Sequence, residues 1–332
     1  MAFAGFNTDN TGALTQLLTT WLNKKFVSDL EWALQHKKFT TDAIIPAGSG
    51  ATGRFIVFAA PPAGTSYSTT STTALTELFT TQNEINTITA AGTEITIAEY
   101  GEFHKTSALA MYAAVSGARE KLVKRMRDGA AITIDTLVQT KANTSTNYLY
   151  STAAATGGTT TFSTGSVQNM SAAAIIHAGK ILKANKAKGI SGVAGHPDGH
   201  FAAVLSNKAV LDIVTENTTG RVYWTQAVTN VPGALGQEKW VNGYLGSIFG
   251  TACYETQNAQ TGITYTASST GDVQLVFADG AVGAMAFKDM QPQIILNDVN
   301  SPYKNSDSIA WKVFFGTALI DGNRICKIYS AT

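Results

Sequence analysis

The sequence predicts a mixed α+β fold organised around one very long helix. Residues 107–142 carry apolar side chains at spacings of three, four and seven, which is typical of an amphipathic helix. The segment before this helix is rich in Gly, Thr and Ser and alternates in the manner of β-strands. Charged residues make up only 14% of the chain, against about 25% in ordinary soluble domains. Such a surface indicates burial against other subunits, with aggregation-prone loops as the alternative.

The long helix is expected to have one apolar and one charged face. The apolar stripe consists of Leu109, Tyr112, Val115, Leu122, Met126, Ala130, Ile134 and Leu137. The opposite face carries Glu120, Lys121, Lys124, Arg125, Arg127 and Asp128. A continuous helix over this range would be roughly 54 Å long. Two shorter helices broken at Gly117 or Gly129 are the alternative, because each glycine costs about 1 kcal/mol in a helix.

Two different segments precede this helix. Residues 1–41 predict an amphipathic helical arm that packs either on its own core or on a neighbour. Residues 42–105 contain clustered Gly, Pro, Ser and Thr between strand-like pieces, and they predict a two-stranded excursion with a flexible tip. Because an isolated hairpin is marginal in water, we expect it to lie on another surface.

The elements after the helix are expected to alternate between helices and strands. Ser171 is placed to cap a helix that runs through Lys188, with Gly189 at its C′ position. The remaining expected elements, in chain order, are a strand at Phe201–Leu205, a helix at Ala209–Thr215, a helix near Lys239–Leu245, strands at Ser247–Tyr254 and Val273–Phe277, and two C-terminal strands at Ile309–Ile320 and Arg324–Tyr329 separated by a turn at 321–323.

Composition excludes several classes of protein. A net charge of +1 argues against a dedicated nucleic-acid-binding domain. Cys253 and Cys326 form no CxxC pair and predict either buried thiols in a reducing compartment or at most one bridge. We expect no membrane span, because no run of 18 apolar residues occurs, and the N-terminus has no export signal.

The motifs that could carry chemistry are better explained by turns and loops. The glycines of 48–53 match G-x-G-x-x-G but lead into a strand-like run, whereas a dinucleotide site needs a helix there. His196 and His200 flank a Pro-Asp-Gly turn and have no third ligand nearby. His36, His104 and His177 are each expected on the surface or packed in the interior. No G-x-S-x-G, H-E-x-x-H or Walker motif occurs, so we expect no enzyme, no metal and no cofactor.

Several short segments nevertheless resemble one family when taken in order. They are 20–26 (TWLNKKF), 97–103 (IAEYGEF), 195–198 (GHPD), 309–312 (IAWK) and 321–325 (DGNRI). With the order of elements, they resemble the major capsid proteins of tailed bacteriophages, and most closely the coat proteins of podophage type. That family has the Johnson fold, which encapsulin shells share. Nearly the whole chain takes part in the resemblance.

The resemblance implies a division of the chain into structural regions. Residues 1–41 correspond to the N-terminal arm and 42–105 to the extended β loop. Residues 106–167 and 291–332 correspond to the peripheral domain, with 107–142 as its spine helix. Residues 168–290 correspond to the axial domain, which gathers around five-fold and six-fold axes. Low surface charge then follows from burial against several neighbours in a closed shell.

The resemblance also implies a function and partners. The chain is expected to self-assemble as pentamers and hexamers into an icosahedral head, made in the host cytoplasm, that encloses double-stranded DNA contacted without sequence specificity. No lysine lies between Lys38 and Lys105, so a lysine–asparagine crosslink from the extended loop is excluded. No long helical segment precedes the arm, which implies a separate scaffolding protein beside the portal.

Charge suggests one contact between subunits. Residues 42–104 carry six acidic residues, including Glu77, Glu84 and Glu94, against Arg54 alone, which gives a net charge of about −5. The charged face of the helix is basic at Lys121, Lys124, Arg125 and Arg127. The hypothesis is that acidic loop and basic helix attract each other between subunits in a salt-dependent way. Separate solvation of the two faces is the alternative.

Two other functions remain open at this point. An encapsulin-like nanocompartment would have the same fold and enclose a protein cargo. A β-rich tail or adhesin component would fit the Thr, Ser and Gly content but would lack the long helix.

Overall fold

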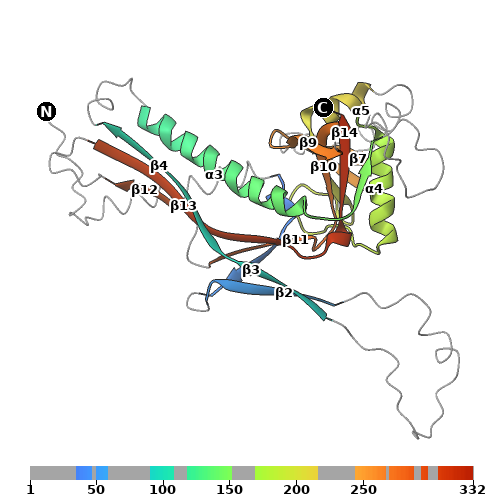
Figure 1. Ribbon diagram of the computed structural model, residues 1–332, viewed down its shortest axis with the longest axis horizontal. Coiled ribbons are helices and arrows are strands. Elements are labelled where there is room, and N and C mark those ends of the chain that lie inside the picture. The colour runs from blue at the N-terminus through green and yellow to red at the C-terminus, as the bar shows by residue number, and fades with distance from the viewer. Residues whose placement is uncertain are drawn as a thin grey trace, which may run out of the picture.

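The architecture is a mixed α+β fold, as the sequence predicted. The computed structural model describes residues 35–46, 50–58, 90–107, 118–151, 169–215, 244–266, 269–287, 293–297 and 306–331. These residues form a five-stranded sheet, a seven-stranded sheet and a two-stranded ribbon. Figure 1 shows the five-stranded sheet beside the long helix α3 and the seven-stranded sheet in a separate lobe. The arm expected over 1–41 lies outside the described residues up to residue 34.

The five-stranded sheet is built on β13 (Ser306–Leu319). The strand β4 (Ala98–Ser107) pairs with one edge of β13, and β12 (Gln293–Asn297) and β11 (Val282–Phe287) pair with the other. The strand β1 (Thr41–Ile45) lies parallel to β11. Successive side chains of a strand point to opposite faces. One face of β13 therefore buries Ile309, Trp311, Val313 and Phe315.

Helix α3 (Ala118–Ala142) covers this buried face. Met126, Ala130, Ile134 and Val138 recur at a spacing of four and pack against β13 in one core cluster. The helix continues through Gly129, as predicted, which excludes the alternative of a break there. Its predicted start at 107 is wrong, because Ser107 pairs with Ser306 as the last residue of β4. Residues 108–117, including Gly117, lie outside the described residues.

The ribbon of β2 (Thr52–Phe58) and β3 (Ala90–Thr96) rests on the opposite face of the same sheet. Ile95 and Ile97 pack with Met285. The ring of Phe55 lies so close to Gly283 that a Cβ added to this glycine would be 2.5 Å from a ring carbon. The expected two-stranded excursion is therefore present and has the supporting surface it needs. The G-x-G-x-x-G segment leads into β2 and not into a helix, so it lacks the context of a dinucleotide site.

The lobe contains the seven-stranded sheet. The strand order is β5 (Tyr148–Tyr150), β14 (Ile325–Ala331), β10 (Ser269–Phe277), β6 (Phe201–Ser206), β8 (Thr251–Thr256) and β7 (Tyr244–Ile248), with β9 (Gln260–Thr266) also paired to β10. The central strand β6 is buried at every residue, as expected of a strand covered on both faces. Helices α4 (Ala172–Ala184) and α5 (Asn207–Thr215) pack on this sheet.

Helix α4 begins as predicted but ends earlier. The hydroxyl of Ser171 accepts a hydrogen bond from the backbone N–H of Ala174 at 3.2 Å, which confirms the N-cap. The helix stops at Ala184, and Lys186 (φ 56°) takes the left-handed position that was expected of Gly189. Backbone N–H groups of Ala187 and Lys186 donate to the carbonyls of Leu182 and Lys183, which completes a Schellman motif.

Two predictions after α4 need correction, and the C-terminal strands are present but lie apart. The helix expected near Lys239–Leu245 is wrong at its C-terminal end, because Tyr244 begins β7. The single strand expected at Ser247–Tyr254 is two strands, since Phe249 and Gly250 both have positive φ and form the turn between β7 and β8. The two C-terminal strands do not pair with each other: β13 lies in the five-stranded sheet and β14 in the lobe.

Sheet membership does not follow the division of the chain that the resemblance implied. The strands β5 and β14, expected in the peripheral domain, belong to the lobe sheet, while β11 lies in the five-stranded sheet. Within the expected extended loop, β1 and β4 also join the five-stranded sheet, and only the ribbon stands apart (Figure 1). The four-part domain division stays a prediction. Among the described helices, none combines the length and the apolar composition that a membrane span requires.

Candidate functional site

The exposed face of α3 carries part of the predicted basic surface. Lys124 and Arg125 are exposed, with Asp128 beside them. Arg127 is not on this face: it is only 9% exposed, and its predicted place on the outer side is wrong. The side chain of Lys121 lies outside the described part of the structure. The structure therefore brings Lys124 and Arg125 together as a basic pair and removes Arg127 from it.

Helix α3 is buried along two stripes, and Arg127 lies on the second. Helix α3 touches the sheet along one stripe and also meets the short 3₁₀ helix η1 (Lys37–Phe39). A second stripe is buried as well, and it holds the polar residues Arg127, Asp135 and Gln139. The helical periodicity of apolar residues detects only the first stripe, because the second is covered by segments remote in sequence.

A buried ion pair joins the N-terminal segment to α3. His36 and Asp135 are each 2% exposed, and the distance from His36 Nδ1 to Asp135 Oδ2 is 2.7 Å. The backbone N–H of His36 donates to Asp135 Oδ1 at 2.8 Å, and the amide of Asn258, after β8, donates to Oδ2 at 3.0 Å. The carboxylate thus connects three segments. The sequence offered no signal for this cluster, since its members are about a hundred residues apart.

The contacts around Asp135 change the pKa values of Asp135 and Lys38. Burial by itself would raise the pKa of Asp135, but the hydrogen bonds and charge of His36, with the Asn258 amide, hold it below its ordinary value. Burial lowers the pKa of Lys38, and the nearby Asp135 opposes that shift. The Asp135 carboxylate is therefore ionised at neutral pH, and both of its oxygens have hydrogen-bond partners inside the chain.

The turn at 196–200 is structural, as expected. His196 Nδ1 lies 2.8 Å from the Tyr254 hydroxyl and Nε2 lies 3.0 Å from the His200 carbonyl, so both ring nitrogens have partners. Its ring packs with Phe39, which also contacts Tyr254 and Phe277. Phe39 thereby fixes η1 in the core beside the His36–Asp135 pair. No group of metal-ligating side chains gathers anywhere in the described part of the chain.

Several acidic residues of 42–104 have basic partners in their own chain. Asp42 pairs with Lys37, Glu99 with Lys312 at 3.7 Å, and Glu102 with His104 at 3.2 Å. The indole N–H of Trp311 also donates to Glu102 at 3.4 Å. Glu94 is exposed and lies opposite Arg54 in the ribbon. Glu77 and Glu84 lie outside the described residues. Of Glu77, Glu84 and Glu94, the last is therefore the member that the structure describes, and it is exposed.

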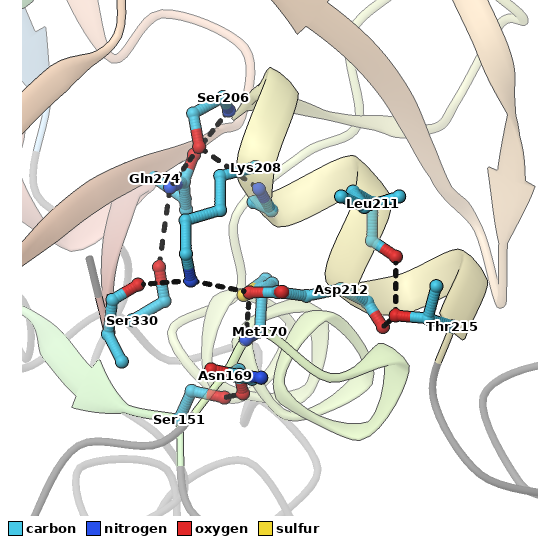
Figure 2. Close-up of polar contacts among 12 residues, drawn as sticks. Ser151, Asn169, Met170, Ser206, Lys208, Leu211, Asp212, Thr215, Gln274 and Ser330 are labelled. Atoms are coloured by element: carbon cyan, nitrogen blue, oxygen red, sulfur yellow. Dashed lines mark hydrogen bonds and ion pairs between the residues drawn. The ribbon is translucent and has the colours of Figure 1, made fainter.

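A second polar cluster ties α5 and the start of α4 to the end of the chain (Figure 2). The buried side chain of Gln274 accepts from the backbone N–H of Ser206 at 2.7 Å and donates to the Ser206 hydroxyl at 3.0 Å. Lys208 donates to Asp212 at 3.2 Å and to the Ala331 carbonyl at 2.9 Å. Asp212 also accepts from the backbone N–H of Met170. These hydrogen bonds hold the end of β14 against α5 and the residue that precedes the α4 cap. The sequence did not indicate this cluster.

The two cysteines are free, so the predicted thiol form holds. Both are buried, and burial raises the pKa of Cys253 and of Cys326 to about 12. Thiols that stay protonated are poor nucleophiles and poor metal ligands.

Comparison with known proteins gives a clear result for the fold. No family model matches the chain, and no curated protein sequence does. Solved structures match over nearly the whole chain. The capsid of Ralstonia phage GP4 is 12% identical with a TM-score of 0.60 and covers 89% of this chain and 87% of its own. The capsid structure of cyanophage P-SCSP1u is 13% identical with a TM-score of 0.59 and covers 90% and 89%. The head structure of Helicobacter pylori bacteriophage KHP40 is 10% identical with a TM-score of 0.58 and covers 90% of both chains.

The chain has the fold of tailed-phage capsid proteins. The resemblance stated from the sequence is thereby confirmed for the fold, although identities of 10–13% are too low for residue roles to be carried over.

Proposed function

We propose that this chain is the major capsid protein of a tailed bacteriophage, and that it assembles into pentamers and hexamers of an icosahedral head around double-stranded DNA. The observation that carries the proposal is a shared architecture covering about nine-tenths of this chain and of each of the three phage capsid proteins. A charged fraction of only 14% supports it, because a shell subunit buries surface against several neighbours. The role is structural and requires neither catalysis nor cofactor.

The further partners follow from this role. We propose a separate scaffolding protein, a portal, assembly in the host cytoplasm, and contacts with packaged DNA that do not depend on its sequence. Near-neutral net charge supports the last point, because a strongly basic interior would hold DNA too tightly for packing and release.

We also propose that the acidic ribbon and the basic face of α3 meet between subunits. The exposed pair Lys124 and Arg125 and the exposed Glu94 are the described residues that support it. Arg127 no longer belongs to this surface. The intrachain partners of Asp42, Glu99 and Glu102 reduce the charge available for the contact, so the attraction is weaker than the sequence alone suggested.

The test of the main proposal is assembly of the purified full-length chain. Sedimentation and negative-stain electron microscopy are expected to show closed shells or capsomer rings, with or without a co-expressed scaffold. A chain that stays monomeric with every candidate scaffold from its genomic neighbourhood would refute the proposal. Shells that carry a protein cargo, with an ultraviolet absorbance free of nucleic acid after production in cells, would favour an encapsulin-like compartment.

The contact between subunits has its own test. The variant K124E/R125E is expected to reduce shell yield at low salt, and E94K is expected to restore part of it in the same chain. Both sites are exposed, so folding can be checked by circular dichroism. Normal assembly of K124E/R125E at 50 mM salt would remove this contact from the proposal and leave the capsid assignment intact.

A further inference from the structure

The charge of this chain is separated along its sequence in a way that net charge hides. Residues 136–197 contain five lysines and neither Asp nor Glu. Four of these lysines, at positions 180, 183, 186 and 188, lie where α4 ends. All four side chains are exposed. We name these four residues the lysine cluster.

The lysine cluster has no acidic partner among the described residues: none of its members takes part in an ion pair there. The neighbouring acids are engaged elsewhere. Asp321 pairs with Arg324 at 3.1 Å, and Asp198 accepts from the backbone N–H of Gly192. Asp279 approaches through its backbone, which donates to the Lys188 carbonyl. The described part of the chain therefore leaves most of the cluster's positive charge without a counter-charge.

The helix end explains only part of the cluster. A cation in the last turn interacts favourably with the helix dipole, which accounts for Lys183. Lys186 and Lys188 lie beyond the helix. Lys186 has a φ of 56°, a conformation that glycine adopts at lower cost. Lysine stands there in spite of the backbone, which suggests that its side chain has a use.

We propose that the lysine cluster is a binding surface for the phosphate backbone of double-stranded nucleic acid. Lysine is a flexible point charge that suits phosphate contact without reading bases. The main competing partner is an acidic segment of a second copy. Among the four acids described in residues 42–104, three have a partner in their own chain, which reduces the charge that this part of a second copy offers. The inference rests on the proposed function for its choice of polyanion.

The test uses the full-length chain as unassembled subunits and a fluorescein-labelled 30-base-pair duplex of mixed sequence. Binding is measured by anisotropy between 50 and 200 mM salt. Four phosphate contacts predict affinity that falls on the order of 100-fold over this range. The variant K180Q/K183Q/K186Q/K188Q is expected to lose at least tenfold in affinity at 50 mM salt and most of the salt dependence.

A matched control removes charge from exposed positions away from α4. The variant R54Q/K105Q removes the same charge as K186Q/K188Q from exposed positions on β2 and β4 and is expected to bind within about twofold of the unmodified chain. The double variant K186Q/K188Q leaves α4 itself untouched and is expected to give about half of the loss in salt slope. Thermal unfolding confirms that each variant is folded.

Several results would overturn the inference. They are an equal loss in the cluster and control variants, no loss in the cluster variant, or tighter binding of a 20-residue polyglutamate probe than of the duplex. The last result would indicate an acidic protein partner. Electron microscopy separates this inference from the proposed function. If shells form but the cluster variant binds DNA normally, only the proposed DNA-binding surface is refuted. If the chain never assembles but its DNA binding depends on the lysine cluster, only the capsid proposal is refuted.

Discussion

The helices α3 and α4 bury their surfaces in different ways. Helix α4 lies on one sheet, and its buried residues are all apolar or small: Ala172, Ala174, Ile175, Ala178, Gly179 and Leu182. Helix α3 buries an apolar stripe against the five-stranded sheet and also Arg127, Asp135 and Gln139 against other segments. The difference shows that α4 covers a single surface, whereas α3 is the element at which the sheet, the N-terminal segment and the lobe meet.

This difference also divides the sources of stability. The contacts of α4 follow from the hydrophobic effect and from local caps, which are non-directional or close in sequence. Those of the polar stripe on α3 are directional and bring together residues about a hundred positions apart. Breaking a buried ionic contact leaves a charge without compensation, so the polar stripe is the more sensitive of the two.

The largest effect is expected from Asp135→Ala. This change leaves the buried His36 and Asn258 without their acceptor and should cost about 3 to 5 kcal/mol in free energy of unfolding. Urea unfolding of unassembled subunits, followed by circular dichroism, measures it. The control is Asp42→Ala, which removes a carboxylate that is 62% exposed and should cost under about 1 kcal/mol. Equal losses would mean that the buried pair is no more important than a surface pair.

A smaller loss is expected from the apolar contact of α4. Leu182 is fully buried, and Leu182→Ala should cost roughly 3 kcal/mol through lost burial and the cavity left behind. The same urea experiment measures it. Leu211, exposed on α5, provides the control, and Leu211→Ala should change stability by less than about 0.5 kcal/mol. A loss at Leu182 no greater than at Leu211 would contradict the described packing of α4.

The contact between His36 and Asp135 on α3 should also weaken in acid. The folded-state pKa of Asp135 lies below the ordinary value of 3.8, so the unfolded chain takes up this proton first as pH falls. The stabilisation that ionised Asp135 gives the folded chain is fully present above about pH 5. It is lost as the pH falls below the ordinary pKa of an aspartate and then through the lower pKa of Asp135 in the folded chain. Unfolding free energies between pH 6 and pH 2 should fall less steeply for Asp135→Asn than for the unmodified chain. Parallel curves would show that Asp135 is not the group responsible.

Loss of the α4 cap should have a moderate effect. Ser171→Ala removes the acceptor for the Ala174 N–H and should cost about 1 kcal/mol. Ser171→Asp keeps an acceptor at the cap and should restore most of the loss, which a change in unfolding midpoint will report. If Ser171→Asp were as unstable as Ser171→Ala, the hydroxyl would contribute through something other than the cap.

The smallest effect has the opposite sign. Lys186→Gly removes the cost of a left-handed lysine and should stabilise the chain by about 0.5 to 1 kcal/mol. The same variant should bind duplex DNA more weakly if the lysine cluster acts as proposed. A variant that is more stable but binds DNA unchanged would confirm the backbone cost and remove Lys186 from the DNA-binding surface.

What the sequence determined by itself is local or periodic. The helical repeat of Met126, Ala130 and Ile134 located the core of α3, Ser171 located the start of α4, and the order of short motifs indicated the capsid fold. Local rules nevertheless failed where two conformations compete: Lys186 ends α4 in place of Gly189, and Phe249 turns a predicted single strand into a hairpin. Element ends are decided by small energy differences that tertiary contacts can outweigh.

Only the tertiary structure decided the rest. Arg127 was predicted outside and is buried, while η1 and the segment after β8 contact Asp135 on the same buried stripe of α3. His36 gained a role that no spacing could indicate, since its partner Asp135 is 99 positions away. The strands β13 and β14 are separated into two sheets although they adjoin in sequence. The physical reason is common to all three: apolar periodicity reports that a surface is buried, but not which distant segment buries it or which polar groups that segment brings.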